Sequence, residues 1–314
     1  MNAGVLFPGQ GSQTADMAEP WTVHEAGRAV LDLASEAIGR DLVEACRDEG
    51  LLATTEFVQP ALLACDVAAF RVLEAEGVAF AAAAGHSLGE FAALVAAGAL
   101  ELADALEVVR VRGRAMQRAS EERPGTMSAL IGLGPEEAAA ICAGQAQGEV
   151  LVVANENAPN QVVVSGTPGA VERAELAARA RGARAIRLAV AGAFHSALME
   201  PALEPIRAAL DAVEIRTARI PVVANVTGEP VRDAAQIRAL LERHVVSPVR
   251  WEQSMRWFAD SGFDALVEAG PGQVLAKLAG RQLPGIRALP AGSPPQAAEV
   301  ARLLAGQGRR EARA

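Results

Sequence analysis

The sequence predicts an α/β fold in which a large domain contains an inserted βαββαβ unit. Short apolar strands alternate with helices along most of the chain, and the stretch from 126 to 191 has a strand order of its own. A Gly-x-Ser-x-Gly segment at Gly85–Gly89 also joins a predicted strand to a predicted helix. With 314 residues, 51% of them hydrophobic, the chain is long enough to bury a sizeable core.

Composition narrows the functional classes. A net charge of −9 argues against a nucleic-acid-binding surface, and it means that an anionic substrate needs a local cation. Cys46, Cys65 and Cys142 lack metal-ligand or redox spacing, and their odd number is typical of a reducing cytosol rather than a disulfide framework. We expect no signal peptide, membrane span or metal site, because no leader pattern, long apolar run or ligand cluster is visible.

The first predicted strand, Val5–Phe7, is followed at once by the glycine-rich loop 8–13. A Gly-Gln-Gly loop leaves backbone N–H groups free and lets another group approach them. An ordinary strand-to-helix turn explains the same residues equally well. Another helix is expected over 61–76, with its apolar side chains on one face.

The segment Gly85–Gly89 follows a run of small residues at 78–84 and precedes a helix that ends near Gly98. Such a strand, turn and helix form a nucleophile elbow, in which two glycines permit the sharp turn. Ser87 then presents its hydroxyl at the positive end of the helix dipole. A chance match in a glycine-rich chain is the alternative, and the flanking elements argue against it.

A helix over about 102–119 contains three arginines close together. On a helical wheel Arg112 lies beside the apolar stripe, whereas Arg114 points to solvent and Arg110 lies on the opposite border. Arg112 is therefore a candidate for a partly buried cation. A surface arginine that buries only its aliphatic stem is the alternative.

The stretch 126–191 reads as strand, helix, two strands, helix and strand, which is the ferredoxin-like order. We therefore predict a small subdomain over 126–191, inserted between the segments 1–125 and 192–314 of the large domain. The second segment contains predicted strands at 221–226 and 265–269 and predicted helices at 237–244, 251–260 and 273–279.

A serine nucleophile needs a base, and the chain has four histidines. His86 neighbours Ser87 on the turn, so its side chain points elsewhere, and His24 lies in a polar helical region. His195 and His244 remain as candidates. His195 is favoured because it lies in a loop of small residues just before a helix. These residues predict a serine acyl-transfer enzyme.

Five segments in order resemble the malonyl-CoA:acyl-carrier-protein transacylase family and the related acyltransferase domains of polyketide synthases. They are FPGQGSQ at 7–13, GHSLGE at 85–90, RGRAM at 112–116, GAFHSALM at 192–199 and EAGPG at 268–272. The resemblance covers roughly residues 3 to 290. It implies a hydrolase-like, parallel-sheet core domain with a ferredoxin-like insert, in agreement with the strand order described above.

The resemblance also implies a role for each matched residue. Ser87 would carry the acyl group and His195 would act as general base and acid. The backbone N–H groups of Gln10 and Leu88 would form the oxyanion hole. Arg112 would hold the distal malonyl carboxylate through a two-pronged ion pair.

Two positions bear on specificity and on the base. Fatty-acid members often carry glutamine where this chain has His244, and the resemblance implies that the residue there positions the catalytic histidine, in part through its backbone carbonyl. A backbone contact survives a change of side chain, so His244 is expected to orient His195 in this way. Phe194 resembles the malonyl-selecting form of the loop in polyketide acyltransferases. A phenyl ring there would crowd a methyl group on the substrate, which favours malonyl over methylmalonyl.

The resemblance implies malonyl transfer from malonyl-CoA to the phosphopantetheine thiol of an acyl carrier protein, by a ping-pong mechanism and without a cofactor. It implies a cytoplasmic monomer serving fatty acid or polyketide synthesis. The alternatives are a trans-acting polyketide acyltransferase that uses methylmalonyl-CoA or another extender, a serine thioesterase or hydrolase, and a non-catalytic subunit that binds carrier proteins. The sequence leaves the pathway, the carrier protein and the extender open.

Overall fold

The large domain is built on a six-stranded, mostly parallel sheet in a computed structural model that describes residues 1–311, with side chains to residue 305. The strand order is β10-β9-β1-β2-β7-β8, and only β8 runs antiparallel to its neighbour. Every residue of β1, β2 and β9 is buried, as expected for a parallel sheet that is covered on both faces. The strands are β1 (Ala3–Phe7), β2 (Ala82–Gly85), β7 (Val222–Val223), β8 (Pro230–Val231), β9 (Ala265–Ala269) and β10 (Arg287–Ala291).

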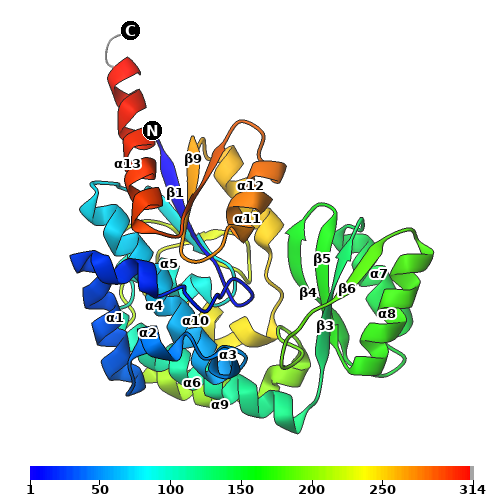
Figure 1. Cartoon of the computed structure of the whole chain (residues 1–314). Coiled ribbons are helices and arrows are strands. Elements are labelled where there is room, and N and C mark those ends of the chain that lie inside the picture. Colours follow the sequence, from blue (N-terminus) through cyan, green and yellow to red (C-terminus); the bar gives the residue numbers. More distant parts are fainter. Residues whose placement is uncertain (312–314) are drawn as a thin grey trace.

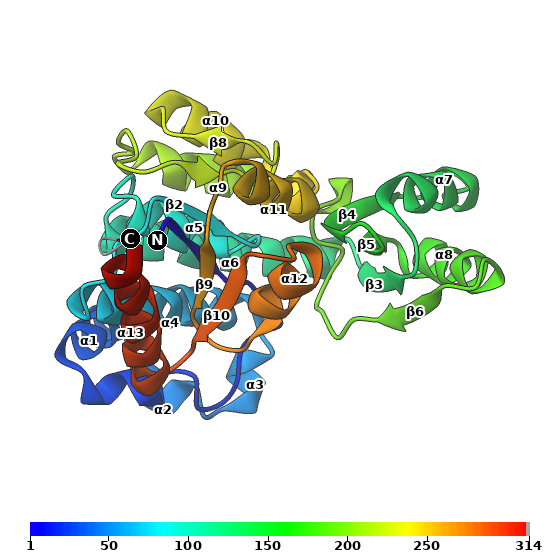
Figure 2. The same ribbon diagram turned by 90° about the horizontal axis from the view of Figure 1, so that it is seen from above.

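Helices cover both faces of this sheet (Figures 1 and 2). Successive residues of β1 point to opposite faces, so Leu6 packs in one hydrophobic cluster with α11 and α12, while Val5 and Phe7 pack in another with α1 and α4. The helices of this domain are α1 (Glu25–Ile38), α2 (Leu42–Ala45), α3 (Glu49–Leu52), α4 (Thr55–Ala75), α5 (Gly89–Ala96), α6 (Leu102–Glu122), α9 (Leu203–Asp211), α10 (Ala234–Arg243), α11 (Trp251–Asp260), α12 (Val274–Gln282) and α13 (Pro294–Glu311).

A separate antiparallel sheet, with strand order β4-β5-β3-β6, lies beside the large domain. Its elements are β3 (Thr126–Ile131), α7 (Pro135–Gln145), β4 (Leu151–Ala158), β5 (Gln161–Gly166), α8 (Pro168–Ala180) and β6 (Arg184–Arg187). Figure 2 shows α7 and α8 on the side away from the large domain. Leu130, Val162 and Val164 pack with these helices, which leaves the opposite face of the sheet toward the large domain.

The two sheets confirm the predicted fold class. The chain enters the second sheet at residue 126, and the order βαββαβ is present in full. The boundaries at 125 and 192 remain a prediction. Over residues 1–311, no helix combines the length and the apolar content that crossing a bilayer requires.

The structure differs from the sequence expectation mainly at strands near the sheet edges. The strand predicted over 221–226 is only Val222–Val223, because Ala224 enters a turn and Asn225 bonds to the Ser87 turn instead of to a strand. The edge strands β8 and β10 were not predicted. Both contain proline and are only partly buried, so neither has the apolar alternation of an interior strand.

Candidate active site

Ser87 lies on a sharp turn between β2 and α5, at the carboxyl end of the parallel strands. Its φ angle of +50° lies in the left-handed region, which is strained for a residue with a side chain. The glycines on either side make this turn possible. A Cβ on Gly89 would lie 2.1 Å from the carbonyl oxygen of Phe7, and a Cβ on Gly85 would lie 1.9 Å from the backbone of Gly89. The turn therefore has the geometry of a nucleophile elbow.

Asn225, which the sequence reasoning missed, holds this turn in place. Its side-chain Oδ1 accepts from the Ser87 N–H at 2.6 Å, and its Nδ2 donates to the Gly85 carbonyl at 2.6 Å. Its own N–H donates to Oε2 of Glu90 at 2.8 Å. Asn225 is fully buried. In the sequence, only its position as a polar residue just after the short apolar strand β7 could have indicated this role.

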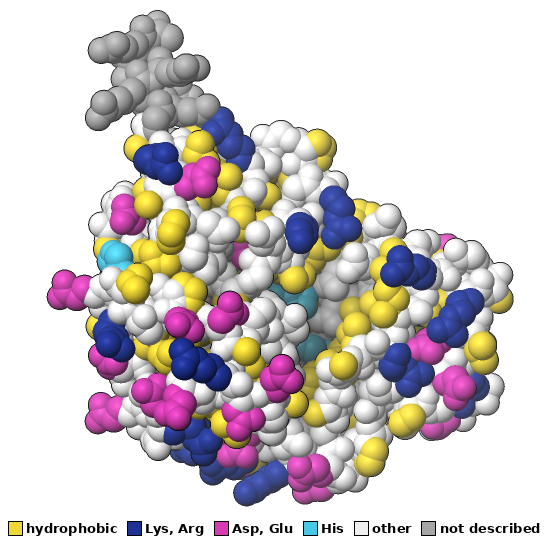
Figure 3. Space-filling view, in the orientation of Figure 1, with side chains coloured by type: hydrophobic (Ala, Val, Ile, Leu, Met, Phe, Trp, Pro, Cys, Tyr) yellow, Lys and Arg dark blue, Asp and Glu magenta, His cyan; other side chains and the backbone are white. Residues whose placement is uncertain are grey.

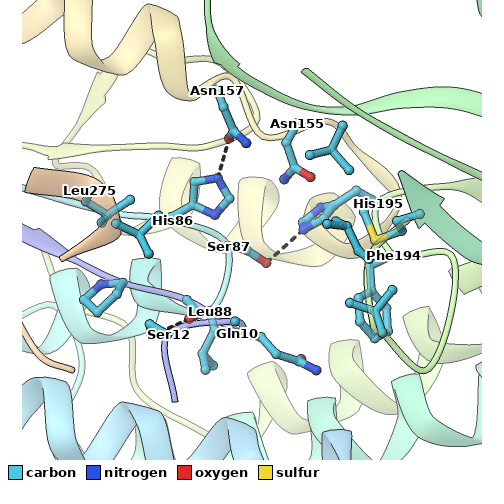
Figure 4. A pocket seen from close by; sticks show the side chains of 18 of the residues that line it. Gln10, Ser12, His86, Ser87, Leu88, Asn155, Asn157, Phe194, His195 and Leu275 are labelled. Atoms are coloured by element: carbon cyan, nitrogen blue, oxygen red, sulfur yellow. Dashed lines mark hydrogen bonds between the residues drawn. The ribbon is translucent and has the colours of Figure 1, made fainter. Parts of the chain in front are cut away.

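His195 directly contacts the serine. Its Nε2 lies 2.8 Å from Ser87 Oγ (Figure 4). Its Nδ1 lies 2.9 Å from the carbonyl oxygen of Ser247 and 3.2 Å from that of His244. Because carbonyl oxygens only accept, the proton belongs on Nδ1 and Nε2 accepts the hydroxyl proton of Ser87.

The surroundings of His195 favour its neutral form. Burial lowers the pKa of His195 well below the usual 6.5, and the neighbouring His244 and the Arg112 guanidinium lower it further. The hydrogen bond to the Ser247 carbonyl acts in the opposite direction. A neutral imidazole can take a proton from the serine, so the pair has the chemistry of a nucleophile and its base.

Arg112 is 1% exposed, which rules out the alternative of a surface arginine. Its Nη1 donates to Oε1 of Gln59 at 2.6 Å and its Nη2 to Ser87 Oγ at 3.3 Å. The Nε–H has no acceptor, and among residues 1–305, whose side chains the structure describes, no carboxylate oxygen lies within 4.0 Å of the guanidinium. Burial lowers the pKa of Arg112 to about 10, although the charge of Glu90 acts in the opposite direction, so the group stays charged at neutral pH. A buried cation that contacts no carboxylate is costly unless an anion binds there.

Close contact between α4 and α6 positions this cation. A Cβ on Gly113 would lie 2.7 Å from the carbonyl oxygen of Thr55, so the glycine lets the two helices touch. Gln59 on α4 and Arg112 on α6 are thereby held side by side behind Ser87. Gln59, like Asn225, was not among the residues expected from the sequence.

Gln10 lies on the loop after β1, next to the elbow. The loop can approach because a Cβ on Gly9 would lie 2.3 Å from the His86 carbonyl oxygen. Within the described chain, the backbone N–H groups of Gln10 and Leu88 donate to no other group. Both residues line the same cleft as Ser87, so two residues with unpaired backbone donors lie in the cleft that holds the hydroxyl.

The cleft lies between the two sheets. Met127, Asn155 and Val163 line it from the small sheet, and Leu275 and other residues of α12 line it from the large domain. Figure 3 shows the hollow, with histidine side chains at its base. Phe194 is 7% exposed and lines the cleft beside His195.

The other two histidines serve different contacts. His86 turns away from Ser87, as predicted, and its Nε2 bonds to Oδ1 of Asn157 in β4 at 2.8 Å. His24 caps α1 by accepting from the Ala26 N–H at 3.2 Å. In the described part of the chain, no group of three or more His, Cys, Asp or Glu side chains is arranged to bind a metal.

Comparison with known proteins identifies the family. The acyl transferase domain family matches residues 5–302. A malonyl CoA-acyl carrier protein transacylase of Haemophilus influenzae is 40% identical over 292 residues, covering 91% of this chain and 93% of the relative. This chain belongs to the malonyl-CoA:acyl-carrier-protein transacylase family. It is therefore an acyltransferase.

Other transacylases are similar to this chain in sequence and in structure. That of Bacillus subtilis is 39% identical over 278 residues, covering 87% of this chain and 88% of the relative. The solved transacylase of Coxiella burnetii superposes with a TM-score of 0.93 at 36% identity, over 96% of this chain and 97% of that one. A malonyl-transacylase solved in complex with its type II PKS acyl-carrier protein also gives a TM-score of 0.93, at 36% identity, over 96% of this chain and 100% of that one.

Proposed function

We propose that this chain transfers a malonyl group from malonyl-CoA to the phosphopantetheine thiol of an acyl carrier protein, through a malonyl ester on Ser87. The observation that carries the proposal is the buried guanidinium of Arg112 next to the Ser87–His195 pair, without a carboxylate of its own. A substrate with a free carboxylate beyond its thioester supplies the missing anion. The names of the related transacylases support the same substrates.

In the first half-reaction, His195 Nε2 takes the hydroxyl proton as Ser87 Oγ attacks the thioester carbon. The developing oxyanion is stabilised by the N–H groups of Gln10 and Leu88. The carbon–sulfur bond then breaks, and His195 gives its proton to the CoA thiolate. The Nδ1–H bonds to the carbonyls of Ser247 and His244 keep the ring in position throughout.

The second half-reaction repeats these steps with a new thiol. His195 takes the proton of the phosphopantetheine thiol, and the thiolate attacks the malonyl ester. The same two N–H groups stabilise the second oxyanion, and the proton returns to Ser87 Oγ as the ester bond breaks. Each step uses only side chains, backbone groups and the two thiols, so the proposal includes no cofactor.

Arg112 binds the distal carboxylate in this proposal, and Phe194 limits the space beside the substrate. Arginine suits the task because its planar fork can donate two parallel hydrogen bonds to one carboxylate. The Phe194 ring lies next to the base, where a methyl group on the substrate carbon would crowd it. Malonyl is therefore the proposed acyl group, and methylmalonyl is the alternative extender.

We also propose a cytoplasmic monomer that binds no nucleic acid. The net charge of −9 disfavours a nucleic-acid surface, and the three buried, unpaired cysteines suit a reducing compartment. The proposal covers carrier proteins of both fatty acid and polyketide synthesis, since both kinds carry the same prosthetic arm.

The test is to incubate the protein with malonyl-CoA and follow its intact mass. A malonyl adduct that is absent in Ser87→Ala and discharges only when a holo carrier protein is added is the expected result. Rapid release of free malonate without the carrier would support the alternative of a serine thioesterase. No adduct and no turnover would support a non-catalytic binding subunit.

A further inference from the structure

The side chain of His244 lies behind the cleft, where it contacts both Arg112 and Asn225, the residue that holds the Ser87 turn. Its Nδ1 is 3.5 Å from Arg112 Nη2, and its Nε2 is 3.4 Å from Asn225 Oδ1 and 3.5 Å from Glu90 Oε2. It is 1% exposed and does not line the cleft. Any effect of this imidazole on the reaction must therefore pass through its neighbours.

These contacts assign the proton on His244. Asn225 Oδ1 and Glu90 Oε2 are acceptors, so Nε2 carries the hydrogen. The Nδ1 lone pair is then free to accept from the Arg112 guanidinium, which cannot itself accept. The neutral ring is a donor on one side and an acceptor on the other, and it satisfies both neighbours.

These hydrogen bonds form a closed ring that begins at the hydroxyl of Ser87 and returns to its backbone N–H. Arg112 donates to Ser87 Oγ and to His244; His244 donates to Asn225; and Asn225 accepts from the Ser87 N–H. The centre of the Phe91 ring lies 5.8 Å from the guanidinium carbon, which is over its face, and 6.4 Å from the His244 ring centre, in an edge-to-face contact. The imidazole thus links the carboxylate-binding cation to the turn that carries the nucleophile.

We propose that the His244 side chain is a positioning residue that sets the distance between the Arg112 guanidinium and Ser87, and thereby the preference for acyl groups with a distal carboxylate. This inference rests on the proposed role of Arg112 as the carboxylate-binding group. It adds to the backbone contact, in which the His244 carbonyl accepts from His195. The two contacts are separable, because every substitution at 244 keeps the carbonyl.

The experiment compares His244→Leu and His244→Gln, using malonyl-CoA and acetyl-CoA as parallel donors. Leucine fills similar space without a polar atom, whereas glutamine restores one donor and one acceptor. In His244→Leu we expect kcat/KM for malonyl transfer, relative to acetyl transfer, to fall about tenfold to a hundredfold, the effect of losing one hydrogen bond to a charged group. In His244→Gln the ratio of malonyl to acetyl transfer should fall less than in His244→Leu.

Acetyl transfer is the internal reference, since it needs Ser87 and His195 but no carboxylate. His24→Leu and His24→Gln, at a histidine that caps α1 outside the cleft, are the matched controls and should leave the ratio unchanged. An unchanged ratio in His244→Leu, or an equal loss of malonyl and acetyl transfer, would overturn the proposal. Failure of the broader function would be visible already in the unmodified protein, which would then form no malonyl adduct.

Discussion

The guanidinium Nη2 of Arg112 lies 3.3 Å from the hydroxyl oxygen of Ser87, so the cation and the nucleophile are within hydrogen-bond distance of each other. That hydroxyl also lies 2.8 Å from the base, His195. A malonyl group attached to Ser87 would place its free carboxylate next to this guanidinium, which contacts no carboxylate among residues 1–305. This relationship favours transfer of acidic acyl groups over simple ones.

Arg112→Ala should slow malonyl transfer far more than acetyl transfer. Removing one partner of a buried ion pair costs about 3–5 kcal/mol, which corresponds to a loss of hundredfold or more in kcat/KM. Arg112→Lys should recover only part of the loss, because a point charge cannot donate the two parallel bonds of a guanidinium. Steady-state kinetics with the two CoA esters measure the effect. An unaffected rate of malonyl transfer would contradict the proposed role of Arg112.

Asn225→Ala should weaken both the fold and the reaction. It leaves the N–H of Ser87 and the carbonyl of Gly85 without their partner, and each unpaired buried group costs about 1–3 kcal/mol. We expect a lower Tm and slower acylation of Ser87 by malonyl-CoA, measured by thermal unfolding and by single-turnover mass analysis. Asn160→Ala, in an exposed turn, is the matched control. Acylation at the normal rate in Asn225→Ala would contradict this expectation, because it would mean that the Ser87 turn keeps its shape without the Asn225 side chain.

The sequence predicted those parts of the site that local patterns encode. Ser87 stands in a five-residue turn whose glycines mark a sharp bend, and His195 was one of only two histidines left by elimination. Gln59 and Asn225 were missed because their partners are far away in the chain: Gln59 bonds to Arg112, 53 residues on, and Asn225 bonds to Ser87, 138 residues back. No periodicity within α4 or β7 reports such contacts.

The burial of Arg112 also depends on contacts that a local sequence pattern does not report. The helical wheel placed it at the border of the apolar stripe, which is compatible with either a buried or a surface cation. What decides its burial is the contact of α6 with α4 at Gly113 and Thr55, and this contact depends on how the two helices cross. The strands β3 to β6, by contrast, were predictable because each has its own short apolar run and turn.

Gly89→Ala should reduce the yield of folded protein. Its Cβ would lie 2.1 Å from the Phe7 carbonyl oxygen, which belongs to the central strand β1 and cannot move cheaply. Gly144→Ala is the matched control, because this helical glycine has no atom within 4 Å of its added Cβ. Gly144→Ala should stabilise the protein by up to about 1 kcal/mol through helix propensity. Thermal unfolding of both variants checks the pair, and equal Tm values would contradict the expectation.

The acid limb of the pH–rate profile should lie below the range of an ordinary histidine. His195 acts as a base only when neutral, and its pKa is lowered well below 6.5 by burial, by His244 and by Arg112. Activity should therefore persist as pH falls through 6.5 and decline only at lower pH. In Arg112→Ala one positive charge is lost, so the pKa of His195 should rise and the acid limb should move to higher pH. Rates of acetyl transfer, which need no carboxylate contact, test this shift, and a limb that stays in place would contradict it.

Phe194→Ala should relax the preference for malonyl over methylmalonyl. The ring lines the cleft beside His195, and removing it opens space where a methyl group on the substrate would lie. A pocket discriminates one methyl group by about 1–3 kcal/mol, so the ratio of kcat/KM for the two extenders should change by about tenfold or more in favour of methylmalonyl. Competition between malonyl-CoA and methylmalonyl-CoA, read by the mass of the Ser87 adduct, gives the ratio directly. Phe263→Ala, at a buried ring that packs in the separate α11–α12 cluster, controls for general loosening of the core. An equal ratio in Phe194→Ala and the unmodified protein would mean that another part of the cleft selects the extender.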